Sequence, residues 1–172
     1  QMPGRRVALQ LAGSALLASS IRAGAVTRLA PPKGPVLLTV SGHISVTNQD
    51  DTARLDRDQL LGWGVDELRT TTPFTDGVST FTGVLASRLL DGLGAQGSSI
   101  RTSALNDYTI EIPIAELRQY PVLLALDRDG QPLSVRSRGP IWLVYPWSDY
   151  PELDDRIHRQ RSIWQLIELE VV

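Results

Sequence analysis

Cysteine is absent from this sequence of 172 residues, and its absence removes several classes of site at once. Disulfides, thiolate nucleophiles, cysteine-ligated zinc sites and iron–sulfur clusters all need a cysteine side chain. Histidine is scarce too, because His43 and His158 are the only two, which is too few for an all-histidine metal site. The sequence therefore leaves few ways of holding a cofactor.

Lysine is almost absent as well: Lys33 is the only one, so arginine carries nearly all the positive charge. The formal net charge of the chain is −2, and no basic stripe stands out along it. Proteins that bind nucleic acid need such a stripe to neutralise phosphates. We therefore expect no nucleic-acid partner.

Residues 1–25 have the pattern of an export signal. Arg5 and Arg6 give a positive start, residues 7–20 form a small-residue apolar run, and Ala-Gly-Ala at 23–25 fits a cleavage site. The run is shorter than the ~20 residues that a membrane span needs. We expect a periplasmic or otherwise exported protein with no stable membrane span after cleavage. The arginine pair leaves the twin-arginine route and the ordinary secretory route both open.

The remainder of the chain reads as a linker followed by one domain. Residues 26–35 hold three prolines and a glycine, which predicts an extended linker. Residues 36–172 are numerous enough to bury a core without disulfides. Hydrophobic residues make up 42% of the chain and charged ones 21%, which is the composition of an ordinary globular domain.

Three short helices are predicted by apolar residues at helical spacing, at 55–61, 84–93 and 114–118. Asp56 suits the N-cap of the first helix, and Gly94 suits the end of the second. Residues 147–155 are acidic and predict a loop or a short helix. The arginine-rich run that follows, which includes His158, is expected at the surface.

Strands dominate the rest of the domain. The first strand ends at Gly42 or continues through 44–46, and an Asp-Gly step at 129–130 predicts a hairpin. Strands are expected at 36–42, 67–72, 100–104, 108–112, 122–126, 133–135, 141–145 and 163–172. The order lacks regular βαβ alternation, so the predicted class is α+β, with a mixed, sheet-rich core and short inserted helices.

The stretch from 68 to 94 is the most promising place for a ligand. A strand of β-branched residues leads through a polar turn into the helix predicted at 84–93. The N-terminus of a helix presents free N–H groups and a partial positive charge. We therefore expect this turn to form part of a binding site.

Several short motifs follow one another in a fixed order along the domain. They are Phe81-Thr82-Gly83-Val84 with Leu89-Leu90, Ala104-Leu105-Asn106-Asp107-Tyr108 leading to Ile112-Pro113, Leu123-Leu124-Ala125, Asp129-Gly130, Pro132-Leu133, Gly139-Pro140 and Tyr145-Pro146. In this order and spacing, residues 36–172 resemble the molybdopterin-binding oxidoreductase domain of the sulfite oxidase type. The resemblance implies an α+β fold that holds a pterin-dithiolene molybdenum cofactor and moves oxygen atoms or electrons.

The resemblance also implies that a protein cysteine ligates the metal, from the loop between a strand and the Gly-Val helix. The matching place here is Thr70-Thr71-Thr72, with Thr71 the best single match. A threonine hydroxyl is a poor substitute, because it is a hard donor whose proton is difficult to remove. Thr71 and Thr72 are either the remnant of a ligand loop or simply the end of a strand, for which threonine is well suited.

Two further groups are candidates for cofactor binding. Asn106, Asp107 and Tyr108 match the family segment that lines the pterin pocket, but Asn-Asp also suits a structural strand break. Arg136 and Arg138 are suited to gripping a phosphate or an anionic substrate, or are merely solvated.

Two functions stay open at this point, and with them the question whether the protein is an enzyme. One is a periplasmic molybdopterin-dependent oxidoreductase-like protein without the usual cysteine-ligated molybdenum. The other is a cofactor-free periplasmic module that keeps the fold for sensing, for interaction or for binding a small molecule or anion.

Overall fold

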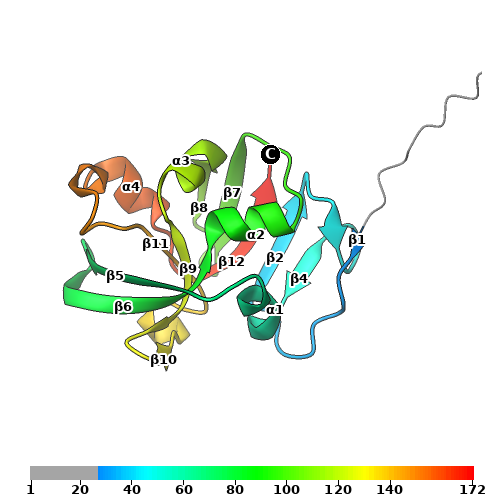
Figure 1. Ribbon diagram of the computed structural model, residues 1–172, viewed down its shortest axis with the longest axis horizontal. Helices are drawn as coiled ribbons and strands as arrows, with labels where there is room; N and C mark the ends of the chain where they lie inside the picture. The colour runs from blue at the N-terminus through cyan, green and yellow to red at the C-terminus, as the bar shows by residue number, and fades with distance from the viewer. Residues whose placement is uncertain (1–26) are drawn as a thin grey trace, which may run out of the picture.

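The computed structural model describes residues 27–172, which fold around two five-stranded β-sheets (Figure 1). The first sheet has the order β10-β9-β6-β5, with β11 also paired to β9, and all its pairs are antiparallel. Its strands are β5 (Asp66–Thr72), β6 (Thr75–Leu85), β9 (Leu123–Arg128), β10 (Gln131–Pro132) and β11 (Trp142–Val144).

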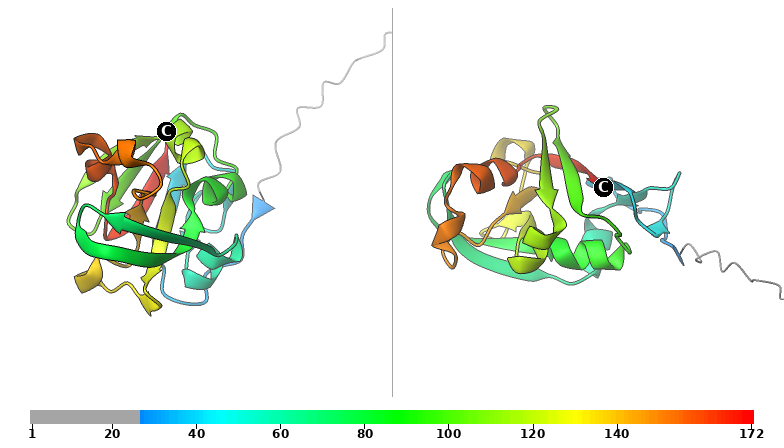
Figure 2. Two further views of the ribbon diagram at one scale, coloured as in Figure 1. Left: turned by 60° about the vertical axis from the view of Figure 1, so that its left-hand side comes forward. Right: turned by 90° about the horizontal axis from the view of Figure 1, so that it is seen from above.

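The second sheet has the order β4-β2-β12-β7-β8. Strand β12 runs parallel to β2 and antiparallel to β7, so this sheet is mixed, as predicted. Its strands are β2 (Leu38–Gly42), β4 (Ala53–Leu55), β7 (Ser99–Ala104), β8 (Thr109–Pro113) and β12 (Leu166–Val171). Seen from above, the β7–β8 hairpin extends beyond the rest of the molecule (Figure 2).

The N-terminal part of the described chain lies along the second sheet. Strands β1 (Thr27–Arg28) and β3 (Val46–Thr47) form a short parallel pair. Further on, the backbone N–H groups of Lys33 and Gly34 donate hydrogen bonds to the Asp56 carboxylate. The export signal predicted for residues 1–25 lies outside the described residues.

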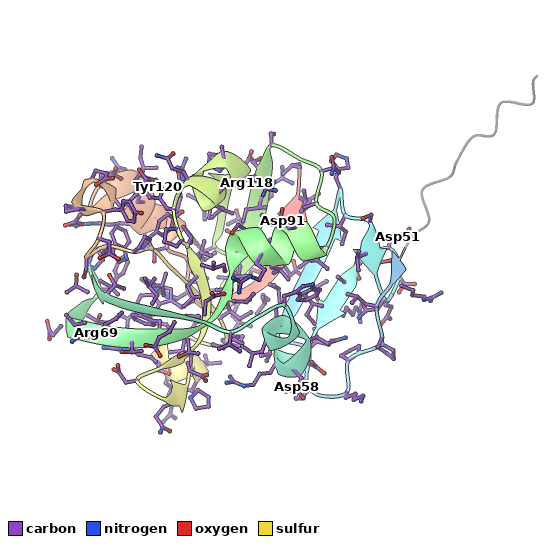
Figure 3. The ribbon with its side chains drawn as sticks, viewed as in Figure 1. Asp51, Asp58, Arg69, Asp91, Arg118 and Tyr120 are labelled. Atoms are coloured by element: carbon purple, nitrogen blue, oxygen red, sulfur yellow. The ribbon has the colours of Figure 1, made fainter. Side chains whose placement is uncertain are left out.

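Short helices connect the strands. They are α1 (Arg57–Gly62), α2 (Ala86–Gly92), α3 (Ile114–Gln119) and α4 (Arg156–Arg161), with 3-10 turns η1 (Val135–Ser137) and η2 (Pro151–Leu153). Asp91 of α2 and Arg118 of α3 form an exposed ion pair of 2.9 Å (Figure 3). Within residues 27–172, no helix is long and apolar enough to cross a membrane.

Both faces of the first sheet are covered where β9 and β11 pair. Leu124 and Leu143 point into the larger core cluster, which fills the space between the sheets and helices. Their neighbours Leu123 and Trp142 point to the other face and pack with Phe81 in a second cluster. Side chains alternate between faces along a strand, so a strand buried on both faces is apolar throughout.

Gly83 lets β6 approach β9 closely. A Cβ atom at this position would lie 1.9 Å from the carbonyl oxygen of Leu124, a distance that no side chain can tolerate. The backbone angle φ of Gly83 lies outside the left-handed region, so the requirement comes from space and not from conformation. The Gly-Val motif of the sequence is therefore a packing feature of the sheet.

The prediction of a polar turn before the second helix is wrong. Residues 75–85 form β6, and the chain reverses at the two residues Pro73 and Phe74. A strand of 11 residues has a contour length of roughly 35 Å, so Thr71 and the start of α2 lie at opposite ends of it. The first N–H of α2, that of Ala86, already donates to the carbonyl of Val122. The helix start therefore contributes nothing to a ligand loop at Thr71.

Most other elements agree with the sequence-based predictions, and the α+β class is confirmed. Asp56 caps α1 in a reciprocal arrangement with Gln59, and Gly94 follows α2 in a left-handed conformation, with φ of 63°. The Asp-Gly hairpin is present, with positive φ at both Asp129 and Gly130. The region expected as loop or short helix contains η2.

Two strand boundaries and the burial of one side chain differ from the predictions. The second strand of the Asp-Gly hairpin is β10, and residues 135–137 form the turn η1. The last strand begins at Leu166 and not at 163. The arginine-rich run forms α4, in which the His158 side chain is only 18% exposed because it packs edge-on against Tyr145. Each of these features depends on tertiary packing, which the local sequence pattern does not predict.

The Asp56 cap gives a first test of this architecture. We expect Asp56→Ala to lower the free energy of unfolding by about 1–3 kcal/mol, because three backbone N–H groups lose their acceptor. Urea denaturation measures the loss. Asp58→Ala, at an exposed position in the first turn of α1, is the matched control and should change stability little.

The same carboxylate makes the stability dependent on pH. Hydrogen bonds from backbone N–H groups, that of Gly34 above all, lower the pKa of Asp56 from its ordinary value. Its stabilisation is therefore complete above the unfolded pKa of ~3.9 and is lost as the pH falls through the lower folded pKa. Acid titration of the two variants checks this: only Asp56→Ala should flatten the acid limb, and an unchanged limb would contradict the assignment.

Candidate functional site

Thr71 lies at the end of β5, beside the hairpin turn that joins β5 to β6. The strand register shifts between Thr70 and Thr72, so Thr71 lies at an irregularity of the ladder. Thr72 closes the turn through its hydroxyl, which lies 2.7 Å from that of Thr75 and accepts a hydrogen bond from the Phe74 N–H. Thr71 is exposed, whereas its two threonine neighbours are buried.

Ser148 ties this strand end to the segment after β11. The N–H of Thr71 donates to the Ser148 hydroxyl at 2.9 Å, and the two hydroxyl oxygens lie 3.2 Å apart. The Ser148 N–H in turn donates to the Thr70 hydroxyl at 3.0 Å. The hydroxyl of Thr71 is therefore already part of a local hydrogen-bonded network.

A small hollow, which we term the Thr71 hollow, opens beside this network. Its volume is about 230 Å³, and it is lined by Thr71, Thr72, Pro73, Trp147, Pro151 and Asp154. The indole N–H of Trp147 is buried and has no hydrogen-bond partner within residues 27–172. One lining residue of the hollow is thus a carboxylate, and another carries a buried donor that lacks an acceptor.

A second hollow, the Trp164 pocket, lies between the β7–β8 hairpin tip and the chain from α4 to β12. Its volume is about 250 Å³. It is lined by Ala104, Asn106, Tyr108, Arg159, Gln160, Ser162, Ile163 and Trp164. Two of the residues predicted for the pterin pocket, Asn106 and Tyr108, therefore share a pocket in the structure.

The hairpin tip holds these residues by local hydrogen bonds. The side-chain oxygen Oδ1 of Asn106 accepts from the Tyr108 N–H, and the Tyr108 hydroxyl donates to the backbone carbonyl of Gln160. Asp107 has a positive φ of 64° and is exposed, outside the lining of the pocket. The side chain of Asp107 thus belongs to the turn and not to the pocket wall.

Arg138 and Arg136 have different surroundings. The guanidinium of Arg138 lies over the rings of Trp142 and Trp164, 5.0 and 5.2 Å from their centroids, and donates to the carbonyl of Phe74. Arg136 is exposed in η1 and makes no side-chain hydrogen bond within residues 27–172. Arg138 thus connects the hairpin turn after Thr72 to the wall of the Trp164 pocket.

Helix α4 is anchored to the body through Glu116 of α3. The Glu116 carboxylate accepts from Arg161 and, at 2.7 Å, from the Tyr145 hydroxyl, and the His158 ring lies 3.6 Å away. Burial, and then this hydrogen bond, raise the pKa of Tyr145, so it stays protonated and acts as a donor. Hydrogen bonds from His158 lower the pKa of Asp155, the N-cap of α4.

An ion pair connects the two hollows. Asp154 lines the Thr71 hollow and Arg159 lines the Trp164 pocket, and their side chains are 2.6 Å apart. Both side chains are about half exposed, so the pair contributes little to stability. Its consequence is local, because Asp154 offsets part of the positive charge of Arg159.

Sequence reasoning missed the residues that come from the segment 147–164. Ser148, Asp154, Arg159 and Trp164 belong to no recognisable motif. The one signal that could have found them is the concentration of tryptophan, aspartate and arginine between two apolar strands. Loops that carry such residues often carry function.

The comparison with known families fits this geometry. A family model described as "Oxidoreductase molybdopterin binding domain" matches residues 57–149, from α1 to just after β11. The match covers more than half of the chain, so this protein belongs to that family, and the predicted α+β molybdopterin-binding-domain fold is confirmed. Family membership supports an oxidoreductase-like function. A comparison with curated proteins gave no match.

The family's cofactor can be tested against the residues around Thr71, and they do not fit a molybdenum ligand. Thr71 offers a hard hydroxyl that is engaged with Ser148, and the Asp154 carboxylate in the same hollow would repel an anionic ligand. The hollow of about 230 Å³ also falls below the ~300–1,000 Å³ of sites for drug-sized ligands. Within residues 27–172, no three His, Cys, Asp or Glu side chains are grouped as metal ligands. No reaction step follows from these residues through molybdenum.

The Ser148 network predicts how the strand end behaves. In Ser148→Ala the Thr71 N–H loses its acceptor, so we expect its hydrogen exchange to become roughly fivefold faster, with a loss of about 1 kcal/mol in stability. Amide exchange followed by NMR measures both. Ser98→Ala, at an exposed serine whose side chain makes no hydrogen bond within residues 27–172, is the control. Equal exchange in the two variants would show that Ser148 does not hold Thr71.

Proposed function

We propose that this protein is an exported, oxidoreductase-like member of the family that works without a protein-thiolate ligand to molybdenum. In this proposal the fold serves as a cofactor-free module that binds a small molecule or an anion. The observation that carries it is the Thr71 hydroxyl, which stands at the position matched to the ligand cysteine and is engaged with Ser148.

The chemistry of the donor supports this reading. Thiolate ligands are soft and lose their proton readily, whereas an alcohol is hard and keeps its proton at neutral pH. Thr71 would have to give up its contact with Ser148 before it could approach a metal. Among the described residues, no cation lines the Thr71 hollow to stabilise an alkoxide, and the charged group there, the Asp154 carboxylate, disfavours a second negative charge.

Export rests on the sequence pattern of residues 1–25, with its arginine pair, apolar run and cleavage motif. A protein exported in this way would meet small molecules and partner proteins of the periplasm. A sensory or interaction role fits the same module, since a fold can persist after its chemistry is lost.

A second candidate is a molybdopterin-dependent oxidoreductase that holds its cofactor without a thiolate. One observation favours it: the buried Trp147 indole N–H, beside the Thr71 hollow, has no acceptor within residues 27–172. A buried donor without a partner needs an explanation, and a bound water, anion or cofactor would each supply one.

Metal and pterin analysis decides between the two candidates. The protein is expressed with its N-terminal segment in a host that makes molybdopterin, and is purified from the periplasm. We expect molybdenum and pterin far below one equivalent per chain. Stoichiometric cofactor, together with turnover of a sulfite or a sulfoxide, would overturn the proposal and establish the second candidate.

Thr71→Cys shows whether the ligand alone is missing. Because the hollow is small and faces Asp154, we expect this variant to remain without molybdenum in the same host. Thr71→Ser is the matched control for the loss of the threonine methyl group. Gain of cofactor by the cysteine variant would mean that the pocket is intact and that a single substitution removed its chemistry.

A further inference from the structure

The Trp164 pocket has a wall that suits a flat ring. Trp164 is 36% exposed and Tyr108 is 40% exposed, which is unusual for large aromatic side chains, and both line the pocket. The indole of Trp164 is held in place by the edge of Phe74, with ring centroids 5.1 Å apart, and by the guanidinium of Arg138. A fixed, exposed indole loses little conformational entropy when a planar ligand packs against it.

The charge around this ring disfavours a cation. Arg138 lies 5.2 Å from the Trp164 centroid and has no carboxylate partner within residues 27–172. Its guanidinium already makes the cation–π contact with the Trp164 ring, so a cationic ligand would compete with it. Arg159 adds a second guanidinium from the lining itself, and Asp154 neutralises it only in part because both groups are half exposed.

The polar groups of the lining are mainly donors. Arg159 uses its Nε and one terminal nitrogen on a single oxygen of Asp154, which leaves its other terminal nitrogen unpaired within residues 27–172. The side-chain NH₂ groups of Asn106 and Gln160 make no hydrogen bond within the same part of the chain. Ser162 has no free donor for a ligand, because its hydroxyl donates to the Leu143 carbonyl and accepts from the Trp142 indole N–H. Free donors beside an aromatic wall are the recognition elements for a carboxylate on a ring.

We propose that the Trp164 pocket binds a small aromatic carboxylate, with its ring against Trp164 and its carboxylate toward Arg159 and Asn106. The volume of about 250 Å³ lies below the ~300–1,000 Å³ of sites for drug-sized molecules, so the ligand is a single-ring compound. This inference rests on the proposed function, a cofactor-free binding module, and names its ligand class.

Benzoate is the probe. The ¹⁵N-labelled protein carries four tryptophans, and therefore four indole N–H signals in an NMR spectrum. Addition of benzoate should shift the Trp164 signal saturably, while the signals of Trp63 and Trp147, which do not line this pocket, stay in place. Trp164→Phe assigns the signal by removing it. Benzylamine, which has the same ring and a positive charge, should not bind.

Two variants change the affinity in opposite directions. Arg159→Gln should weaken benzoate binding about tenfold, the effect of losing one charge-assisted hydrogen bond. Asp154→Asn should strengthen it severalfold, because Arg159 loses its competing partner. Arg156→Gln, an exposed arginine on the same helix, is the matched control and should leave the affinity unchanged. If Arg159 had a purely structural role, Asp154→Asn would not strengthen benzoate binding.

Three results would overturn the inference: no saturable shift of the Trp164 signal, equal binding of benzylamine, or equal affinity in Arg159→Gln and Arg156→Gln. These results leave the proposed function standing if the protein from the cofactor-making host is free of molybdenum. Stoichiometric molybdenum with normal benzoate binding would refute the proposed function alone, so the two failures are distinguishable.

Discussion

The close approach of β6 to β9 at Gly83 is the constraint on which the rest of the structure depends. A side chain there would collide with the Leu124 carbonyl at 1.9 Å, so the sheet is continuous only with glycine. Strand β6 pairs with β5 on its other side, and it thereby joins the hairpin that carries Thr71 to the core. The same strand delivers Phe81 to the cluster around Trp142, beneath the wall of the Trp164 pocket. The absence of a side chain at Gly83 thus allows the strand pairing that positions both hollows.

Sequence patterns predicted the elements whose signals are local. Helix α1 carries its own cap, and strands buried on both faces, such as β9, are apolar along their whole length. Strand β6 was missed because Asp76 and Gly77 are typical turn residues. The ladder with β5 resumes at Ser79, and the pairing of residues 81–85 with the distant strand β9 extends the strand through Gly83. Helix α4 was missed for a similar reason, since it is held by a Glu116 contact that spans 45 residues of sequence.

The candidate site was predictable in part. The motif around Asn106 and Tyr108 drew attention to a hairpin tip that does line a pocket, and Arg138 proved to lie against its aromatic wall. Arg159 and Trp164 complete the pocket from a segment more than 50 residues further along the chain, and no spacing rule connects them with Asn106. The suitability of threonine for strands indicated that Thr71 lies at the end of a strand, as it does, but its contact with Ser148 arises only in the folded chain.

The central claim is that the fold of a molybdopterin-binding oxidoreductase domain persists here with Thr71 engaged by Ser148 in place of a thiolate bound to metal. The hard hydroxyl of Thr71, the small volume of the Thr71 hollow and the charge of Asp154 all disfavour a molybdenum ligand at this place. Native mass spectrometry of the protein from a host that makes molybdopterin tests this claim most directly. The account predicts the mass of the polypeptide alone, or with a small organic anion. A stable species that carries the added mass of pterin and molybdenum would contradict it.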